Sequence, residues 1–130
     1  PIVKIISINF YGGKRFYNHG GMAGKKAMLC FTLGGRDYMF GENAIHGSIT
    51  EYLSPIQRGT LAYAGFEVLP PFIAYHVPYI SNEDRQNILI NFEAYLNDLQ
   101  NLEPLTFPLI ENFDEKIALI ISPKIQILIC

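Results

Sequence analysis

Cysteine and charge are both scarce in this sequence, and each scarcity excludes a class of protein. Cys30 lies inside an apolar run and Cys130 is the last residue, a spacing that fits neither a metal site nor a disulfide framework. We therefore expect reduced thiols and a cytoplasmic protein. Charged residues make up 17% of the chain, and the net charge is −2. This balance argues against a nucleic-acid partner, even for the basic and aromatic stretch between residues 11 and 26.

Long hydrophobic runs are also missing. The longest uninterrupted aliphatic run, residues 117–121, is far shorter than the ~20 residues that cross a bilayer. No charged leader precedes an early apolar segment. We therefore expect no membrane span.

Hydrolase and metal signatures are absent from the sequence as well. There is no Ser-His-Asp order, no nucleophile elbow and no motif of paired carboxylates. His19 lies in a glycine-rich loop and His76 in a predicted extended stretch, and neither has Cys, Asp or Glu at ligand spacing. We therefore expect no metal. A phosphate-binding loop after a first strand is likewise missing.

The chain is long and apolar enough for one core, with 130 residues of which 49% are hydrophobic. It begins with Pro1 and an apolar stretch, so we expect a piece of a longer protein. An irregular apolar segment with two prolines, residues 103–114, is expected to lie across a surface, and we call it the strap. Residues 117–130, with eight Ile or Leu in fourteen, are expected to pair as strands or to aggregate.

Strands and helices are predicted to alternate along the chain. They are a strand at residues 27–32 covered on both faces, a helix from residue 45 that Pro55 kinks or divides and Gly65 ends, extended chain at residues 66–69 and 72–75 around a proline pair, and a helix capped by Ser81. This alternation predicts an α/β layer arrangement with parallel strands.

Thr32, Gly34 and Gly35 follow the first predicted strand. Ligands of open parallel sheets bind beyond the carboxyl ends of the strands, and glycines let a flat ring approach backbone amides. A tight turn that only closes the strand would use the same residues. His46 follows at the start of the next helix, where a structural role is equally open. Arg85 opposes the dipole of the last helix, which calls for a carboxylate partner or for a phosphate brought by a ligand.

Five short strings, in this order and spacing, resemble the flavodoxin-like NAD(P)H:quinone oxidoreductases of the DT-diaphorase type. They are residues 23–29, 32–35, 45–47, 55–59 and 65–71. The resemblance implies a partial flavodoxin-like parallel sheet flanked by helices, a three-layer α/β/α fragment. Residues 1–115 would form the C-terminal part of that domain, and residues 116–130 a divergent apolar tail.

The resemblance also implies a ping-pong reaction in which NAD(P)H reduces a bound FAD or FMN and a quinone reoxidises it, in a homodimer with its sites at the interface. It assigns residues to the site by position. The residues placed at the flavin ring are Thr32, Leu33, Gly34, Gly35 and Phe40. The catalytic groups would be Tyr11 and His46, of which His46 would stabilise the reduced ring. Tyr11, Tyr63 and His46 would line the pocket for nicotinamide and quinone, and Arg85 and Leu89 would approach the phosphate end of the cofactor.

The chain departs from the family pattern at several positions. Leu33 replaces a threonine and Phe40 replaces a tyrosine that partners the histidine, so two hydroxyl groups are lost. Ser54 replaces a tryptophan, and the N-terminal half with its phosphate-binding loop has no counterpart. Three hypotheses follow: part of a flavin-dependent quinone reductase, a truncated relic that no longer binds flavin, and a dimerisation or interaction module.

Overall fold

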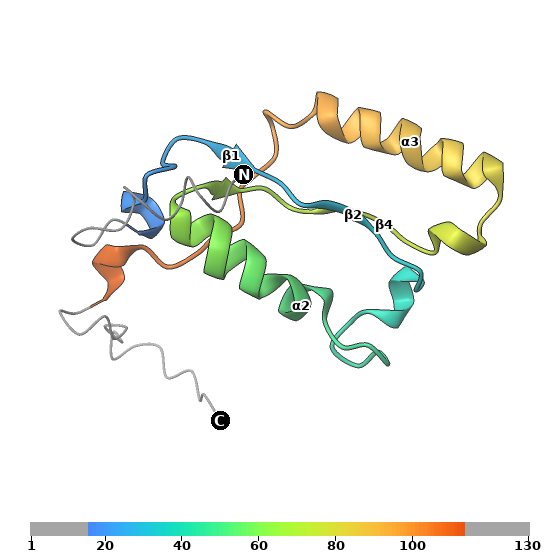
Figure 1. Cartoon of the computed structure of the whole chain (residues 1–130), viewed down its shortest axis with the longest axis horizontal. Coiled ribbons are helices and arrows are strands. Elements are labelled where there is room, and N and C mark those ends of the chain that lie inside the picture. Colours follow the sequence, from blue (N-terminus) through green and yellow to red (C-terminus); the bar gives the residue numbers. More distant parts are fainter. Residues whose placement is uncertain (1–15, 114–130) are drawn as a thin grey trace.

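The computed structural model describes residues 16–113, in which short parallel strands lie between two helices (Figure 1). The elements, in chain order, are η1 (Tyr17–His19), β1 (Lys26–Ala27), β2 (Cys30–Thr32), η2 (Asp37–Met39), α2 (Ile49–Ile56), η3 (Gln57–Ala62), β3 (Glu67–Val68), β4 (Phe72–Ala74), η4 (Val77–Tyr79), α3 (Asn82–Asn97) and η5 (Ile110–Asn112). The alternation of strand and helix agrees with the α/β prediction.

The four strands form two halves of one parallel ribbon. β1 pairs with β3 and β2 pairs with β4, and the N–H groups of Leu69 and Phe72 continue the ladder by donating to the carbonyls of Ala27 and Leu29. The ladder is interrupted between these bonds because Pro70 and Pro71 have no N–H to donate. The prediction of two extended segments around this proline pair is confirmed.

The two long helices cover opposite faces of the ribbon (Figure 1). Phe72 packs against Phe92 of α3, with their ring centroids 4.8 Å apart. Phe31 pairs with Ile73, the residue after Phe72. Its side chain therefore points to the other face of the ribbon, where it lines a cavity with Leu53 of α2. This is the predicted helix, sheet and helix arrangement of a flavodoxin-like fragment.

Pro55 divides the first predicted helix. The α-helical segment begins after Ser48, later than the predicted start at residue 45, and the wider π-helical turn η3 follows it. This agrees with the missing N–H and the ring bulk of a proline inside a helix. Gly65 ends the segment at φ +104°, as predicted. Its α-carbon lies against Gly20, where a Cβ would come within 3 Å of backbone atoms.

The last helix, α3, begins as the sequence predicts. The Ser81 hydroxyl accepts from the N–H of Asp84 at 3.0 Å, and the Asp84 carboxylate accepts from the N–H of Ser81. The apolar side chains of Ile88, Phe92 and Tyr95 on α3 are half-buried, whereas that of Leu96 is 40% exposed. Tyr95 fixes the helix to the ribbon by donating its hydroxyl to the carbonyl of Pro70 at 2.5 Å.

The core of the described chain lies between α2, η3 and the β3–β4 side of the ribbon. Its buried apolar side chains are Leu53, Ala62, Ala64, Val68, Leu69 and Ala74. The strap crosses this region as predicted, with the N–H of Leu105 donating to the carbonyl of Val68 at 2.7 Å.

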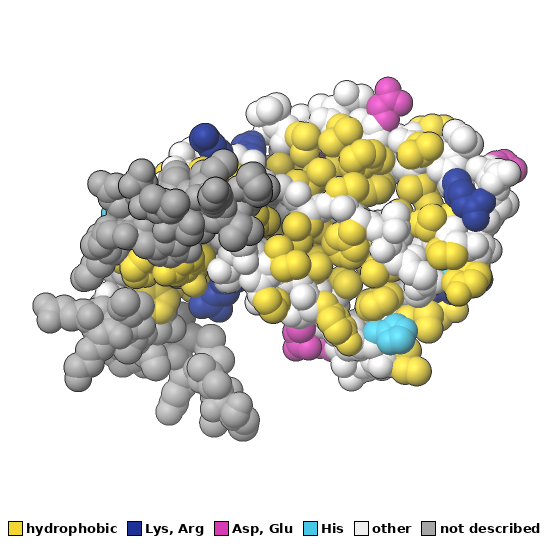
Figure 2. Space-filling view, viewed as in Figure 1, with side chains coloured by type: hydrophobic (Ala, Val, Ile, Leu, Met, Phe, Trp, Pro, Cys, Tyr) yellow, Lys and Arg dark blue, Asp and Glu magenta, His cyan; other side chains and the backbone are white. Residues whose placement is uncertain are grey.

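The prediction that the first strand is covered on both faces is wrong for the part of the chain that is described. Cys30 and Thr32 of β2 are exposed, and within residues 16–113 no strand pairs with the other edge of β1 and β2. Figure 2 shows hydrophobic side chains gathered between the two helices on this side. The apolar composition of the first predicted strand therefore predicts more covering chain than residues 16–113 contain. Residues 1–15, with Tyr11, and the predicted tail lie outside the described residues.

Candidate active site

The carboxyl ends of β2 and β4 meet at one edge of the ribbon and continue into a shared turn. The N–H of Leu33 donates to the carbonyl of Ala74 at 2.8 Å, and the N–H of His76 donates to the carbonyl of Gly35 at 2.9 Å. We call residues 33–35 the glycine turn. It lies where ligands of parallel sheets bind.

The two glycines of this turn have different surroundings. A Cβ added to Gly35 would lie 2.9 Å from the Phe40 ring, so Phe40 packs directly on its α-carbon. A Cβ added to Gly34 would meet only the edge of the Tyr79 ring, at 4.0 Å. Gly35 is therefore required by packing, while the space beside Gly34 is open.

His46 lies on the Phe40 side of the glycine turn. Its ring centroid is 5.0 Å from that of Phe40, and its backbone N–H donates to the carbonyl of Met39 at 3.0 Å. The loop that carries it turns at Gly47, whose φ is +70°. The His46 side chain is exposed to solvent.

An apolar cavity of about 380 Å³ opens next to His46. Its lining residues come from β2, the glycine turn and the start of α2: Phe31, Leu33, Phe40, His46, Ile49, Tyr52 and Leu53. Only His46 and Tyr52 bring polar side-chain atoms to this lining. The cavity can therefore receive a flat apolar group with a polar edge.

Tyr75, the residue after β4, packs against Phe40. Its ring centroid is 5.8 Å from that of Phe40. Burial, together with the negative charge of Asp37, raises the pKa of the Tyr75 phenol above its ordinary value. The phenol therefore stays neutral throughout the physiological range.

Not all predicted site residues come together in one chain. Leu33, Gly35, Phe40 and His46 do. Thr32 ends β2 on the same face as Cys30, opposite the face on which Leu33 lines the cavity.

Tyr63 lies at the far end of the helical segment formed by α2 and η3, about 20 Å from its start at 1.5 Å per residue. There its ring packs on Phe16 and Tyr17, with centroids 5.5 and 5.6 Å away. A pocket that contains both Tyr63 and His46 therefore cannot form within one chain.

Arg85 has neither a carboxylate nor a phosphate partner among the described residues. Its guanidinium donates to the carbonyl of Val77, at 3.3 Å from Nε and 3.2 Å from a terminal nitrogen, and to the side chain of Asn82 at 2.8 Å. The carboxylate partner, one of the two predicted alternatives, is not found among the described residues, where Val77, the first residue of η4, supplies a carbonyl oxygen instead. The phosphate alternative stays a prediction. Leu89, one turn further along α3, is 58% exposed.

Sequence reasoning missed His76. The residue was expected in extended chain, but it has φ +58° and ψ 21°, the left-handed region that non-glycine residues rarely adopt. Its ring Nδ1 lies 3.0 Å from the carbonyl oxygen of Gly34. No short-range signal marks this role, because the bond joins residues 42 positions apart.

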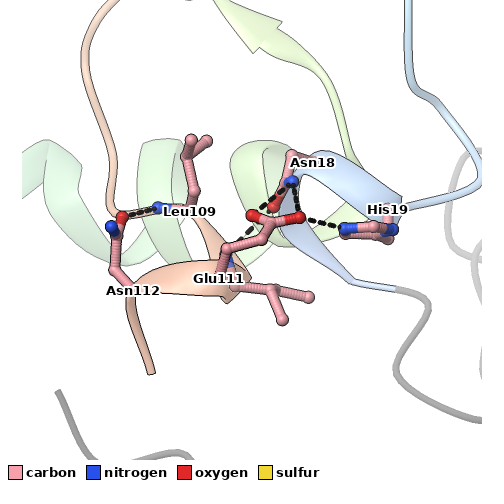
Figure 3. Close-up of polar contacts among 6 residues, drawn as sticks. Asn18, His19, Leu109, Glu111 and Asn112 are labelled. Atoms are coloured by element: carbon pink, nitrogen blue, oxygen red, sulfur yellow. Dashed lines mark hydrogen bonds and ion pairs between the residues drawn. The ribbon is translucent and has the colours of Figure 1, made fainter. Parts of the chain in front are cut away.

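A polar cluster holds the strap at the opposite end of the molecule (Figure 3). The Glu111 carboxylate accepts from the side chain of Asn18 at 3.0 Å and contacts His19 Nε2 at 2.5 Å. The Asn18 side-chain oxygen in turn accepts from the N–H of Ile110. The hydrogen bond from His19 is the main reason that the pKa of Glu111 is below its ordinary value. This cluster is structural, because it closes the strap over the end of the core.

Comparison with known proteins agrees with this geometry. The family model described as "Flavodoxin-like fold" matches residues 6–97. The chain belongs to the flavodoxin-like fold family. It is 36% identical over 98 residues to NAD(P)H dehydrogenase [quinone] 1 of Cavia porcellus and 34% identical over 90 residues to ribosyldihydronicotinamide dehydrogenase [quinone] of Mus musculus. The resemblance derived from the five strings is thereby confirmed.

A solved structure from Klebsiella pneumoniae, assigned as a quinone reductase, superposes with a TM-score of 0.75 at 32% identity. The match covers 80% of this chain and 41% of that one. The matches to the guinea-pig and mouse relatives cover 75% and 69% of this chain but 36% and 39% of theirs. The chain therefore spans about two fifths of the length of such flavodoxin-like proteins.

Within residues 16–113 no helix is long and apolar enough to cross a membrane. In the same part of the chain, no three His, Cys, Asp or Glu side chains gather where they could hold a metal ion.

Proposed function

We propose that this chain is the part of an NAD(P)H:quinone oxidoreductase that contacts the flavin ring and its two substrates. The observation that carries the proposal is the meeting of the glycine turn, Phe40 and His46 beside an apolar cavity at the carboxyl end of parallel strands. The matches to relatives named for quinone reduction cover 75% and 69% of this chain.

The residues of the turn fit the ring end of a flavin, FAD or FMN. Within the described residues the Gly35 N–H has no hydrogen-bond acceptor, and the space beside Gly34 is open to an approaching plane. Leu33 and Phe40 add apolar walls. A bound flavin would supply the two-electron chemistry, taking hydride from NAD(P)H and giving it to a quinone.

His46 is the group that we propose to stabilise negative charge at this edge. An imidazole N–H directed at a developing anion is worth most where the surroundings are apolar, as they are here. Phe40 has no hydroxyl that could hydrogen-bond to His46, whose side chain is exposed to solvent. Tyr75 stays neutral and packs on the Phe40 ring.

A homodimer is part of this proposal. The family pattern calls for Tyr63 and His46 in one pocket, yet they lie at opposite ends of α2 and η3. A second copy can bring its Tyr63 to the His46 of the first. The exposed side chains of Tyr52 and Ile56 on α2, 63% and 47% accessible, are apolar surface that such a contact would bury.

Weak flavin retention by the isolated chain also follows. The sequence has no phosphate-binding loop after a first strand, and each charge-assisted bond to a phosphate contributes about 1.5–3 kcal/mol. Purified chain should therefore be colourless and should bind flavin only when flavin is added. A yellow protein with stoichiometric flavin would contradict the truncation but support the site.

Activity is tested by following NADH oxidation with added FMN and a quinone. His46→Ala should lower the rate by about a hundredfold, the usual effect of removing one donor to a developing anion. His19→Ala is the matched control, because it removes an exposed imidazole at the other end of the molecule. Equal rates for His46→Ala and the unchanged chain would refute the assignment of His46.

A non-catalytic interaction module is the second candidate. Exposed apolar side chains such as Ile45, Tyr79 and Ile90, which are 83%, 74% and 61% accessible, favour it. Sizing chromatography with and without residues 117–130 tests it. An unchanged monomer in both forms would remove this candidate.

A further inference from the structure

His76 lies beside the glycine turn in a conformation that a non-glycine residue adopts only at a cost. Its φ of +58° puts it in the left-handed region, and strain of this kind persists only where the surrounding structure holds it in place. Three hydrogen bonds involve His76. The N–H of Tyr79 donates to its carbonyl at 3.0 Å, and its own two donors, the backbone N–H and the ring, both lead to carbonyls of the glycine turn.

The first bond changes the strand pairing. Regular parallel pairing would direct the N–H of His76 to the carbonyl of Leu33, because the N–H of Leu33 donates to Ala74. Instead the N–H of Val77 takes the Leu33 carbonyl at 3.3 Å, and the N–H of His76 reaches Gly35 at 2.9 Å. The left-handed residue therefore shifts the ladder by one position at the end of the sheet.

The second bond comes from the side chain. A carbonyl oxygen can only accept, so Nδ1 of His76 carries the proton in the 3.0 Å contact with the Gly34 carbonyl. The ring is also held against Tyr79, with centroids 5.0 Å apart. Both glycine carbonyls of the turn are thus fixed on the His76 side.

Fixing the carbonyls also fixes the amides. In a trans peptide the N–H points opposite to the C=O. When the Gly34 carbonyl faces His76, the Gly35 N–H must face away from it, and within residues 16–113 this N–H has no acceptor. It remains available to a ligand.

We propose that His76 is a positioning residue for flavin binding: its imidazole Nδ1–H holds the peptide between Gly34 and Gly35 in the orientation that presents the Gly35 N–H to the flavin ring. This rests on the proposed function. It adds a residue outside the five family strings, and it explains why a histidine occupies a left-handed position where glycine would be free of strain.

Two substitutions distinguish the effect of the imidazole hydrogen bond to Gly34 from the effect of the left-handed backbone at residue 76. His76→Gly keeps the left-handed conformation and the N–H to Gly35 but removes the imidazole. His76→Asn keeps both a conformation that asparagine tolerates and an amide donor at the position of Nδ1. The pair therefore differs only in the bond to the Gly34 carbonyl.

The probe is FMN, titrated to millimolar concentration against the ¹⁵N-labelled full chain and each variant. His76→Gly should weaken FMN binding by about three- to tenfold, the factor that one neutral hydrogen bond carries. His76→Asn should restore the binding of the unchanged chain. The imidazole ¹⁵N shifts of His76, recorded without flavin, should report the Nδ1–H tautomer.

Equal FMN binding by the glycine variant and the unchanged chain, or an Nε2–H tautomer at His76, would overturn the positioning role and leave the proposed function intact. Failure of the unchanged chain to bind FMN at all would overturn the proposed function, and the positioning role with it.

Discussion

Gly34 and Gly35 are neighbours in sequence, but they lack a side chain for different reasons. Phe40 occupies the space beside Gly35, whereas nothing closer than the Tyr79 ring edge, at 4.0 Å, lies beside Gly34. A methyl group added at each position therefore tests a different property. At Gly35 it tests packing, and at Gly34 it tests ligand approach.

We predict that Gly35→Ala destabilises the fold by about 1–3 kcal/mol through overpacking against Phe40. Gly34→Ala should change the free energy of unfolding by less than about 0.5 kcal/mol while weakening FMN binding. Chemical denaturation and FMN titration of both variants check this. An unstable Gly34→Ala variant would contradict the open space beside it.

The Glu111 cluster gives a pH prediction. Its hydrogen bond from His19, then bonds from its own backbone and Asn18, hold the pKa of this carboxyl below the ordinary value of 4.5. Because the folded pKa is the lower one, the stabilising contribution is complete above pH 4.5 and is lost as the pH falls through the folded value. The side-chain amide signal of Asn18 should change in that acid range.

The matched variant for this prediction is His19→Ala. Without the imidazole, the pKa of Glu111 rises, so the change at Asn18 should move toward pH 4.5. An Asn18 signal that titrates identically in both proteins would show that His19 does not hold the carboxylate.

The roles of some single residues could be predicted from the sequence, and the roles of others could not. The glycines after Thr32, the Ser81 cap and the end of the helix at Gly65 are readable because each depends on neighbours within a few positions. The His76 bond to Gly34, the contact of Phe40 with Gly35 and the carbonyl partner of Arg85 are not readable. Each depends on which loops the fold brings together.

At the scale of elements, α3 is held to the ribbon by one aromatic contact region and one hydrogen bond. Phe92 and Tyr95 pack on Phe72, and the Tyr95 hydroxyl donates to the carbonyl of Pro70. Burial raises the pKa of this phenol above its ordinary value, so the donor is intact at any physiological pH. This bond ties α3 to the segment between β3 and β4.

Tyr95→Phe removes that bond and leaves the ring in place. The free energy of unfolding should fall by about 1 kcal/mol, the net contribution of a typical hydrogen bond. Tyr79→Phe is the control, because no hydrogen bond of its hydroxyl is found in the described structure and the side chain is 74% exposed. Denaturant unfolding curves measure both, and equal stabilities would show that the Pro70 contact contributes nothing.

The extended segments and the two long helices were predictable in type and order, because apolar spacing and the prolines act locally. The short 3-10 helices and the division of the first predicted strand into β1 and β2 were not. The π-helical form of η3 was not, since a proline marks an interruption without specifying how the backbone continues. The cover expected on both sides of the first strand was read from its apolar composition, and residues 16–113 do not supply it.

At the scale of the whole molecule, the described chain is one part of a flavodoxin-like sheet, and within residues 16–113 no further strand pairs with either edge of its ribbon. Its buried apolar residues are few and small, with several alanines among them. Gln57 is also buried, and its side-chain nitrogen has no partner in the described structure. A chain of this kind gains stability from whatever binds its open surfaces, so added flavin should raise its melting temperature.

The central claim is that the glycine turn and His46 form the flavin-ring end of a quinone reductase site. A titration of the ¹⁵N-labelled chain with FMN, observed amide by amide, tests it most directly. We predict that the signals of Gly34, Gly35 and His46 shift together while those of Asn18 and Glu111 stay fixed. Shifts confined to the Asn18 end, or none at millimolar FMN, would contradict the account.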